Sequence, residues 1–175
     1  MLDYYDVAYD TCGIGGDLEK SLGYRKILIA GKDLNVVDGS SYRNKDVEGS
    51  IFMDAGRSNL FGILSMSPAA VAFSDFRINK KAIEQMRDKG IALCIPASII
   101  TSSYGLQRSR NMYMARKLLE YARKAGLDVS IVTLARSAAH LCSYMQLVEI
   151  AKLIGSGEKD ARDSIGRVNG SLVVK

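Results

Sequence analysis

The sequence predicts an α/β domain built around a parallel sheet, and two observations support this fold class. Short apolar runs such as KILIAG and IALCIPASI alternate with amphipathic stretches, at the spacing of repeated strand–helix units. The chain has 175 residues, 47% of them hydrophobic, which suits one domain over residues 1–175 with a flexible tail from about residue 169. An open doubly wound sheet and a small closed barrel both fit this spacing.

Six strands are expected at the apolar runs, a number short of the eight strands of a full barrel. They are YYDVAYDTC (4–12), KILIAG (26–31), GSIFMDAG (49–56), AAVAFSD (69–75), IALCIPASI (91–99) and LDVSIVTLA (127–135). The polar stretch 32–48 is expected to be a loop with little regular structure, with one broken turn of helix or an edge strand at LNVV as the two alternatives. The sheet should therefore hold six or seven mostly parallel strands.

Helices are expected between these strands, with a capping residue at several starts. Asp17 is expected to cap LEKSLGY, and Asn79 to cap KKAIEQMRDKG. Further helices are expected at NLFGILSMSP, across the segment that ends at Lys124, at MQLVEIAKLIG and, as a short helix, at EKDARDSIGRV. In the segment before Lys124 one stripe is apolar and should be buried, and the opposite face carries charges.

The composition excludes several kinds of active site. The chain has one histidine, His140, whereas a multinuclear phosphoesterase site needs several histidines and aspartates. No GxSxG elbow and no Walker A motif occurs. The three cysteines are far apart in the sequence and are interpreted as reduced core thiols. We therefore expect no metal or cofactor bound by the protein itself. No apolar run reaches the ~18 residues of a membrane span, so a cytoplasmic protein is expected.

Carboxylates near the strand ends leave one enzymatic alternative open. Asp10, Asp54 and Asp75 could hold a metal at the carboxyl rim of a barrel, and the chain would then be a stand-alone metal-dependent α/β-barrel phosphoesterase. Basic neighbours such as Arg57 and Arg77 favour salt bridges instead.

Basic residues follow most of the predicted strands, in a chain whose net charge is +5. In a parallel sheet they would gather at one rim and bind the phosphate backbone of RNA, unless they are scattered solvated charges. Arg108 and Arg110 have the strongest case, because a helix start favours anions. The RNA-binding candidates are Lys32, Arg43, Lys45, Arg57, Arg77, Arg108, Arg110 and Arg136.

An ordered series of segments resembles archaeal ribonuclease P protein component 3, the family that includes the barrel-like protein subunit of eukaryotic ribonuclease P and MRP. The series is FRINKKAIEQMRDKGIALCIPASII, RSRNMYMARKLLEYARKAGLDVSIVTLARSA, LVEIAKLIG and EKDARDSIG. It covers roughly residues 70–168. The chain departs from the family at SAAHLCSYMQ, which lacks the arginine and proline often found there.

The resemblance implies a compact TIM-barrel-like fold, similar to that of polymerase-and-histidinol-phosphatase phosphoesterases. It implies a subunit of the ribonucleoprotein that removes the 5′ leader of precursor tRNA. In that enzyme the RNA is the catalyst and holds the magnesium, and the protein chain alone is not catalytic. The implied partners are ribonuclease P RNA, protein component 2 and the other protein subunits, with precursor tRNA contacted indirectly. Exposed apolar residues such as Met112 and Met114 could serve a partner face.

Overall fold

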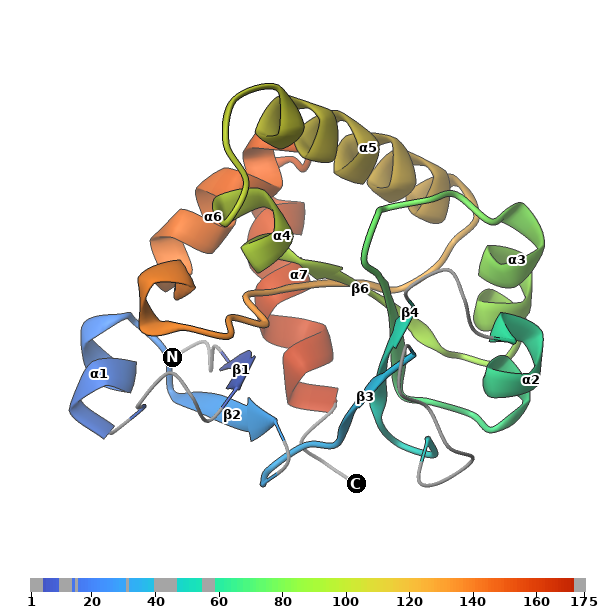
Figure 1. Cartoon of the computed structure of the whole chain (residues 1–175), viewed down its shortest axis with the longest axis horizontal. Coiled ribbons are helices and arrows are strands. Elements are labelled where there is room, and N and C mark those ends of the chain that lie inside the picture. The colour runs from blue at the N-terminus through green and yellow to red at the C-terminus, as the bar shows by residue number, and fades with distance from the viewer. Residues whose placement is uncertain are drawn as a thin grey trace.

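In the part of the chain that the structure describes, seven strands, all paired in parallel, form the centre of the fold (Figure 1). The computed structural model describes residues 5–9, 14, 16–30, 32–39, 47–54 and 59–171. One sheet has the order β1-β2 and the other the order β3-β4-β5-β6-β7, and every pairing is parallel. The strands are β1 (Tyr5–Tyr9), β2 (Lys26–Ala30), β3 (Val36–Asp38), β4 (Ile51–Asp54), β5 (Ala70–Phe73), β6 (Ala92–Pro96) and β7 (Val129–Val132).

Hydrogen bonds between β1 and the end of β7 join the two sheets into one curved wall. The Leu134 amide donates to the Val7 carbonyl at 2.7 Å, and Ala8 forms a parallel bridge with Ala135. The Asp6 side chain also connects the two sheets. The amide of Thr133 donates to its Oδ1 at 2.7 Å, and the Thr133 hydroxyl donates to its Oδ2. The strands therefore follow one another around the wall in chain order, as in a barrel of repeated strand–helix units.

Apolar side chains fill both faces of this wall, and they form two separate clusters. The smaller cluster lies on the inner face and takes alternate residues of the strands, as the two-residue period of a strand requires. Its buried members are Val7, Leu28, Leu34, Ile51, Ala70, Ala72, Ala92, Cys94, Val132 and Leu134. The larger cluster lies between the outer face of the strands and the helices, and it includes Phe52, Ile83, Leu93 and Leu118.

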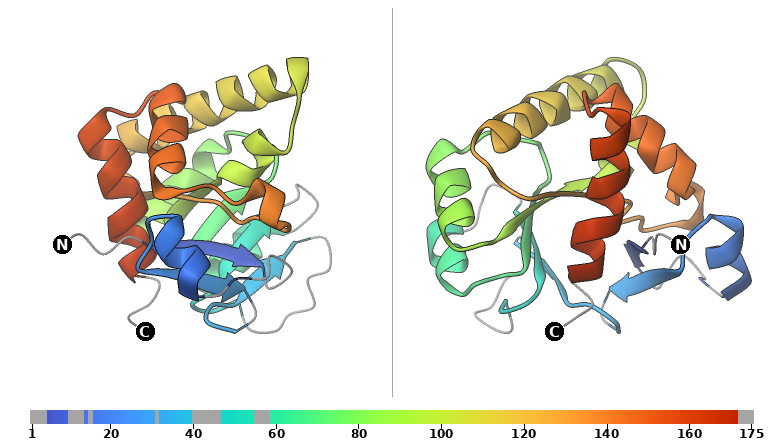
Figure 2. Two further views of the ribbon diagram at one scale, coloured as in Figure 1. Left: turned by 90° about the vertical axis from the view of Figure 1, so that its left-hand side faces the viewer. Right: turned by 180° about the vertical axis from the view of Figure 1, so that it is seen from behind.

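Helices cover the outer face of the wall (Figures 1 and 2). Helix α7 packs on β1 and β7, α3 packs on β6, and α5 packs on β7. The helices are α1 (Gly16–Ser21), α2 (Leu60–Ser65), α3 (Lys80–Asp88), α4 (Ala97–Thr101), α5 (Gly105–Lys124), α6 (Tyr144–Leu153) and α7 (Glu158–Ser171), together with the 3-10 turn η2 (Ala138–His140). No helix in the described part of the chain is both long and apolar enough to cross a membrane.

Most of the predicted strands and helices agree with these bounds, and of the two alternatives at LNVV the structure has the strand, β3. Asn79 caps α3 as expected, since its side chain accepts from the Ala82 amide at 3.2 Å. Three expectations were wrong. Asp17 lies inside the first turn of α1 instead of capping it, α4 follows Pro96 directly where the strand was expected to continue, and α7 is 14 residues long.

Candidate functional site

Cations at the carboxyl ends of the strands are largely engaged by groups of the protein itself. Lys32, Arg77 and Arg136 follow β2, β5 and β7, so the parallel sheet brings them to one end of the wall, as predicted. Arg136 Nη2 lies 3.4 Å from Asp38 Oδ2, and Arg77 is paired with Asp75. Three further candidates, Arg43, Lys45 and Arg57, lie outside the described residues, as does Asp10.

Arg108 binds the end of the preceding helix rather than pointing freely to solvent. Its guanidinium donates to the Ser103 carbonyl at 2.7 Å and to the Thr101 carbonyl at 3.2 Å, and it lies 5.4 Å from the centre of the Tyr104 ring. These bonds satisfy carbonyls that the end of α4 leaves open. The serines and threonine before α5 do not cap it, because Tyr104 holds the N-cap position. Of the two arginines with the strongest case for phosphate binding, Arg108 thus also has a structural role at the end of α4.

Helix α5 accounts for the whole positive excess of the chain. It carries six basic residues and one acidic residue, against 24 and 19 in the full chain, so the remaining sequence holds 18 of each. Arg110 makes no hydrogen bond or ion pair to another described residue and is exposed. A helix of 20 residues is about 30 Å long, which is long enough to follow several phosphates of a nucleic acid.

The solvent side of α5 forms one continuous stripe, which we call the outer stripe. Its members recur at intervals of three and four residues, the spacing of one helix face. They are Leu106, Arg110, Tyr113, Lys117, Glu120 and Lys124. Leu106 is 90% exposed and Tyr113 58% exposed. The opposite face is the predicted core stripe, with Ala115, Leu118, Leu119 and Ala122 buried.

Glu120 is the single acid of the outer stripe and neutralises part of it. Lys124 Nζ lies 3.2 Å from its carboxylate and Lys117 Nζ lies 3.4 Å from it. The hydrogen bonds from Lys124 and then Lys117 lower the pKa of Glu120 below its usual value. Lys117 also lies 6.0 Å from the centre of the Tyr113 ring. The stripe thus combines cations with an exposed aromatic ring, a combination that is typical of protein surfaces that bind nucleic acids.

Two aspartates of the enzymatic alternative, Asp54 and Asp75, are described by the structure, and neither is part of a metal-binding group of described residues. Asp54 is 8% exposed at the end of β4, and Asp75 is paired with Arg77. Within the part of the chain that the structure describes, no group of three or more histidine, cysteine, aspartate or glutamate side chains could hold a metal ion. The described residues therefore offer no metal-dependent hydrolytic centre.

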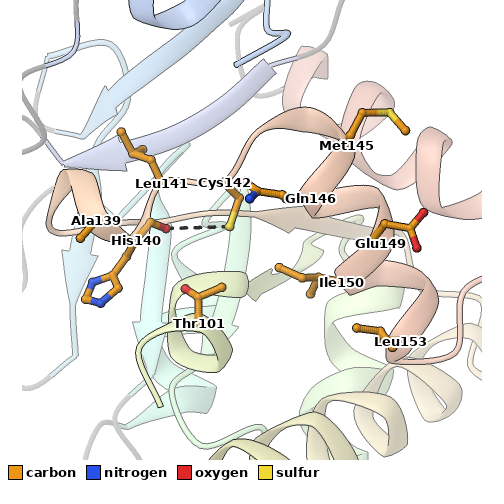
Figure 3. Close-up of a pocket in the computed structure, with 10 residues that line it drawn as sticks. All are labelled: Thr101, Ala139, His140, Leu141, Cys142, Met145, Gln146, Glu149, Ile150 and Leu153. Carbon is orange, nitrogen blue, oxygen red and sulfur yellow. Dashed lines mark hydrogen bonds between the residues drawn. The ribbon is translucent and has the colours of Figure 1, made fainter. Parts of the chain in front are cut away.

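A groove of ≈ 450 Å³ lies between η2 and α6 and contains His140 and Cys142 (Figure 3). The Cys142 thiol lies 3.9 Å from the carbonyl oxygen of His140 and not beside its ring, which points away from the sulfur. Burial raises the pKa of Cys142 to about 11, so the thiol is protonated near neutral pH. His140 Nδ1 lies 3.2 Å from Ser137 Oγ. The pair cannot act as a cysteine–histidine nucleophile in this arrangement.

The lining of this groove is mostly apolar, and it continues toward α5. A second pocket shares Thr101, Ile150 and Leu153 with it and adds Met112 of α5. Leu153 and Met145 are 63% and 53% exposed. Met112 and Met114 were expected to serve a partner face, and both are half-buried against the core. The most exposed apolar side chains on this side therefore belong to α6.

Sequence reasoning placed Lys117 and Lys124 on the solvent side of their helix but did not include them among the RNA-binding candidates. The signal that identifies them is present in the sequence, as the excess of basic over acidic residues within one helix. A count of the basic residues that follow strands missed it, because these lysines lie in the middle and at the end of a helix.

Comparisons with known proteins give the fold and no family. No protein-family model matches the chain, and no curated protein matches it. Among solved structures, A. niger ochratoxinase is similar, with a TM-score of 0.53 and 15% identity over 71% of this chain and 30% of its own. An uncharacterized protein is similar with a TM-score of 0.53 and 12% identity, over 71% of this chain and 33% of its own.

The chain thus spans about a third of the length of the two solved structures named above. At these identities the likeness concerns the fold alone. It agrees with the α/β alternation and the curved parallel wall, and the fold is a TIM-barrel-like α/β fold, as predicted.

Proposed function

We propose that this chain is an RNA-binding protein subunit of a ribonuclease P ribonucleoprotein, which removes the 5′ leader of precursor tRNA. In this role the chain supports the catalytic RNA and has no active site of its own. The observation that carries the proposal is the charge of α5, whose six basic residues and one acidic residue account for the net charge of +5 of the chain. Such a surface suits the phosphate backbone, which attracts cations without regard to sequence.

The resemblance to ribonuclease P protein component 3 supplies the identity of the RNA. Its segments fall on consecutive elements from α3 to α7, and they include α5 with its outer stripe. The TIM-barrel-like fold is the one that the resemblance implied, which supports the proposal without identifying a substrate. Magnesium belongs to the RNA in this proposal, and the protein supplies cations that lower the repulsion between phosphates.

The partner protein, ribonuclease P protein component 2, is proposed to dock against the apolar groove beside α6. Leu153 and Met145 are large apolar side chains left in water there, and burial of such side chains favours association. Leu153→Glu should weaken binding of the partner in a pull-down with purified proteins. Leu106→Glu is the matched control, since Leu106 is equally apolar and lies on the other side of α5 from the core. If Leu153→Glu binds the partner as well as the wild type does, the partner does not dock on the groove beside α6.

Reconstitution tests the function as a whole. Precursor-tRNA cleavage is measured with the cognate RNA and the other protein subunits, with this chain present and with it omitted. We expect cleavage at low magnesium to depend on the chain. An unchanged rate on omission would refute the proposed function, and hydrolysis of phosphoesters by the chain without RNA would favour the enzymatic alternative.

A further inference from the structure

A further cavity lies at the starts of α2 and α3 and has a lining of mixed polar and apolar residues. Its volume is ≈ 510 Å³, within the range of small-ligand sites. The carboxyl ends of β4 and β5 form its floor. The lining residues are Asp54, Asn59, Leu60, Phe61, Phe73, Arg77, Ile78, Asn79, Lys80 and Lys81. We call it the α2/α3 pocket.

The lining of the α2/α3 pocket combines cations with exposed apolar surface. Arg77, Lys80 and Lys81 supply three positive charges. Lys81 is exposed and has no hydrogen-bond or ion-pair partner among the described residues. Phe61 is 45% exposed and Ile78 is 37% exposed, although both are large apolar side chains. A ligand with a flat apolar ring and a negative charge would cover the ring and neutralise the cations together.

Asp54 narrows the chemical class of that ligand. Asp54 is in the same lining and is 8% exposed, so one acidic residue lies among the three basic ones. A carboxylate accepts hydrogen bonds from hydroxyl and amino groups. A nucleotide of RNA presents all three features, namely a ring, a phosphate and donor groups on its ribose and base.

The pocket is also next to the outer stripe, through Lys80. The Lys80 ammonium lies 5.8 Å from the centre of the Tyr121 ring, in the last turns of α5. The views agree that α3 lies beside the C-terminal end of α5 (Figures 1 and 2). The Lys80–Tyr121 contact therefore places the α2/α3 pocket beside the C-terminal end of α5, where Lys124 of the outer stripe lies.

We infer that the α2/α3 pocket binds one unpaired nucleotide of RNA, with its base against Phe61 and its phosphate near Lys81. This inference rests on the proposed function, because it assigns a single-stranded subsite to the same RNA-binding surface. The pocket would give the protein a preference for single-stranded over double-stranded RNA, which phosphate contacts along a helix do not give. A base in a duplex has both faces covered and cannot stack on Phe61.

The test compares two fluorescein-labelled probes by fluorescence anisotropy, a uridine hexamer and a 12-base-pair RNA duplex. Phe61→Leu keeps apolar volume and removes the ring, and Lys81→Gln removes one charge. Phe61→Leu should weaken hexamer binding about 10-fold, since stacking of one base contributes on the order of 1–3 kcal/mol, and should leave duplex binding within about 2-fold. Lys81→Gln should lower the salt slope of hexamer binding by about 0.7.

Met66→Leu is the control, because Met66 is 38% exposed at the end of α2 and does not line the pocket. Melting temperatures show whether each variant is folded. Hexamer binding that is equal in Phe61→Leu and the wild type overturns the inference, and so does a wild type that binds the duplex but not the hexamer. Both of these outcomes leave the proposed function standing. A wild type that binds neither probe overturns the inference together with the proposed function.

Discussion

The carboxyl rim of the barrel and the outer stripe of α5 are both basic in sequence, yet they differ in how far the protein neutralises its own charges. At the rim, Arg136 is paired with Asp38 and Arg77 with Asp75. On the outer stripe two cations, Lys117 and Lys124, share one acid, Glu120, and Arg110 has no partner among the described residues. Cations that are already paired gain less from a phosphate, because the existing ion pair must first be broken.

Charge reversal on the outer stripe should produce the largest effect. The triple variant Arg110→Glu/Lys117→Glu/Lys124→Glu is expected to weaken RNA binding on the order of 100-fold or more at low salt, and to lower the salt slope by about 2 to 3. Filter binding at several salt concentrations measures both quantities. The matched control, Lys20→Glu/Lys89→Glu/Lys159→Glu, makes the same charge change at exposed residues outside α5. Equal losses in both triples would show that net charge alone matters.

A substitution of Asp6 should change the stability of the fold without changing RNA binding by α5. Burial raises the pKa of Asp6 to about 6, whereas its usual value is 3.8, despite the hydrogen bonds from Thr133. The folded state thus holds a proton more tightly, so this group lowers the free energy of unfolding as the pH rises from about 4 to 6. We expect Asp6→Asn to raise the free energy of unfolding by about 1–2 kcal/mol at pH 7, because the variant buries no negative charge. The loss of the hydrogen bonds to the carboxylate offsets part of this gain.

Urea unfolding of the wild type and Asp6→Asn at pH 4, 5, 6 and 7 checks this prediction. The difference between the two proteins should be small at pH 4 and should grow toward pH 7. A constant difference would mean that Asp6 does not titrate in this window. RNA binding at pH 7 should stay within about 2-fold of the wild type, because Asp6 is fully buried between β1 and β7.

Removal of the Glu120 charge should strengthen RNA binding, by less than the charge reversal of the outer stripe weakens it. Glu120→Gln removes the carboxylate that holds Lys117 and Lys124, so RNA binding should strengthen by about 2- to 5-fold at low salt. Glu84→Gln on α3 is the control, since it removes an exposed acid outside the stripe. Binding that weakens in Glu120→Gln would show that the carboxylate positions the two lysines rather than competing for them.

Substitution of a cation at the carboxyl rim should have the smallest effect on RNA affinity. Arg136→Gln is expected to change RNA affinity by less than about 2-fold, since its guanidinium is 3.4 Å from the Asp38 carboxylate. The same filter-binding assay measures it. A loss comparable to that of Arg110→Gln would contradict the distinction between rim and stripe, and would restore the original hypothesis of a basic rim.

Local pattern was enough to predict most of the secondary structure and the buried stripe of α5. Periods of 2 and 3.6 residues reflect burial of one face, which is a local property of the chain. The pattern failed at Pro96, where α4 follows β6 without a break, because an apolar run of this length does not distinguish a buried strand from a short helix. The identity of the inner face of the wall also needed the structure, since it depends on how the two sheets join.

The candidate site divides in the same way. The concentration of positive charge in α5 is a property of the sequence, because residues within one helix are neighbours wherever that helix packs. Which cations remain available was decided by tertiary structure, since Arg136 meets an acid 98 residues away and Arg108 turns back onto the end of α4. The α2/α3 pocket likewise exists only where β4, β5 and the starts of two helices meet. Composition fixes how much charge a chain carries, and the path of the backbone fixes which charges neutralise each other.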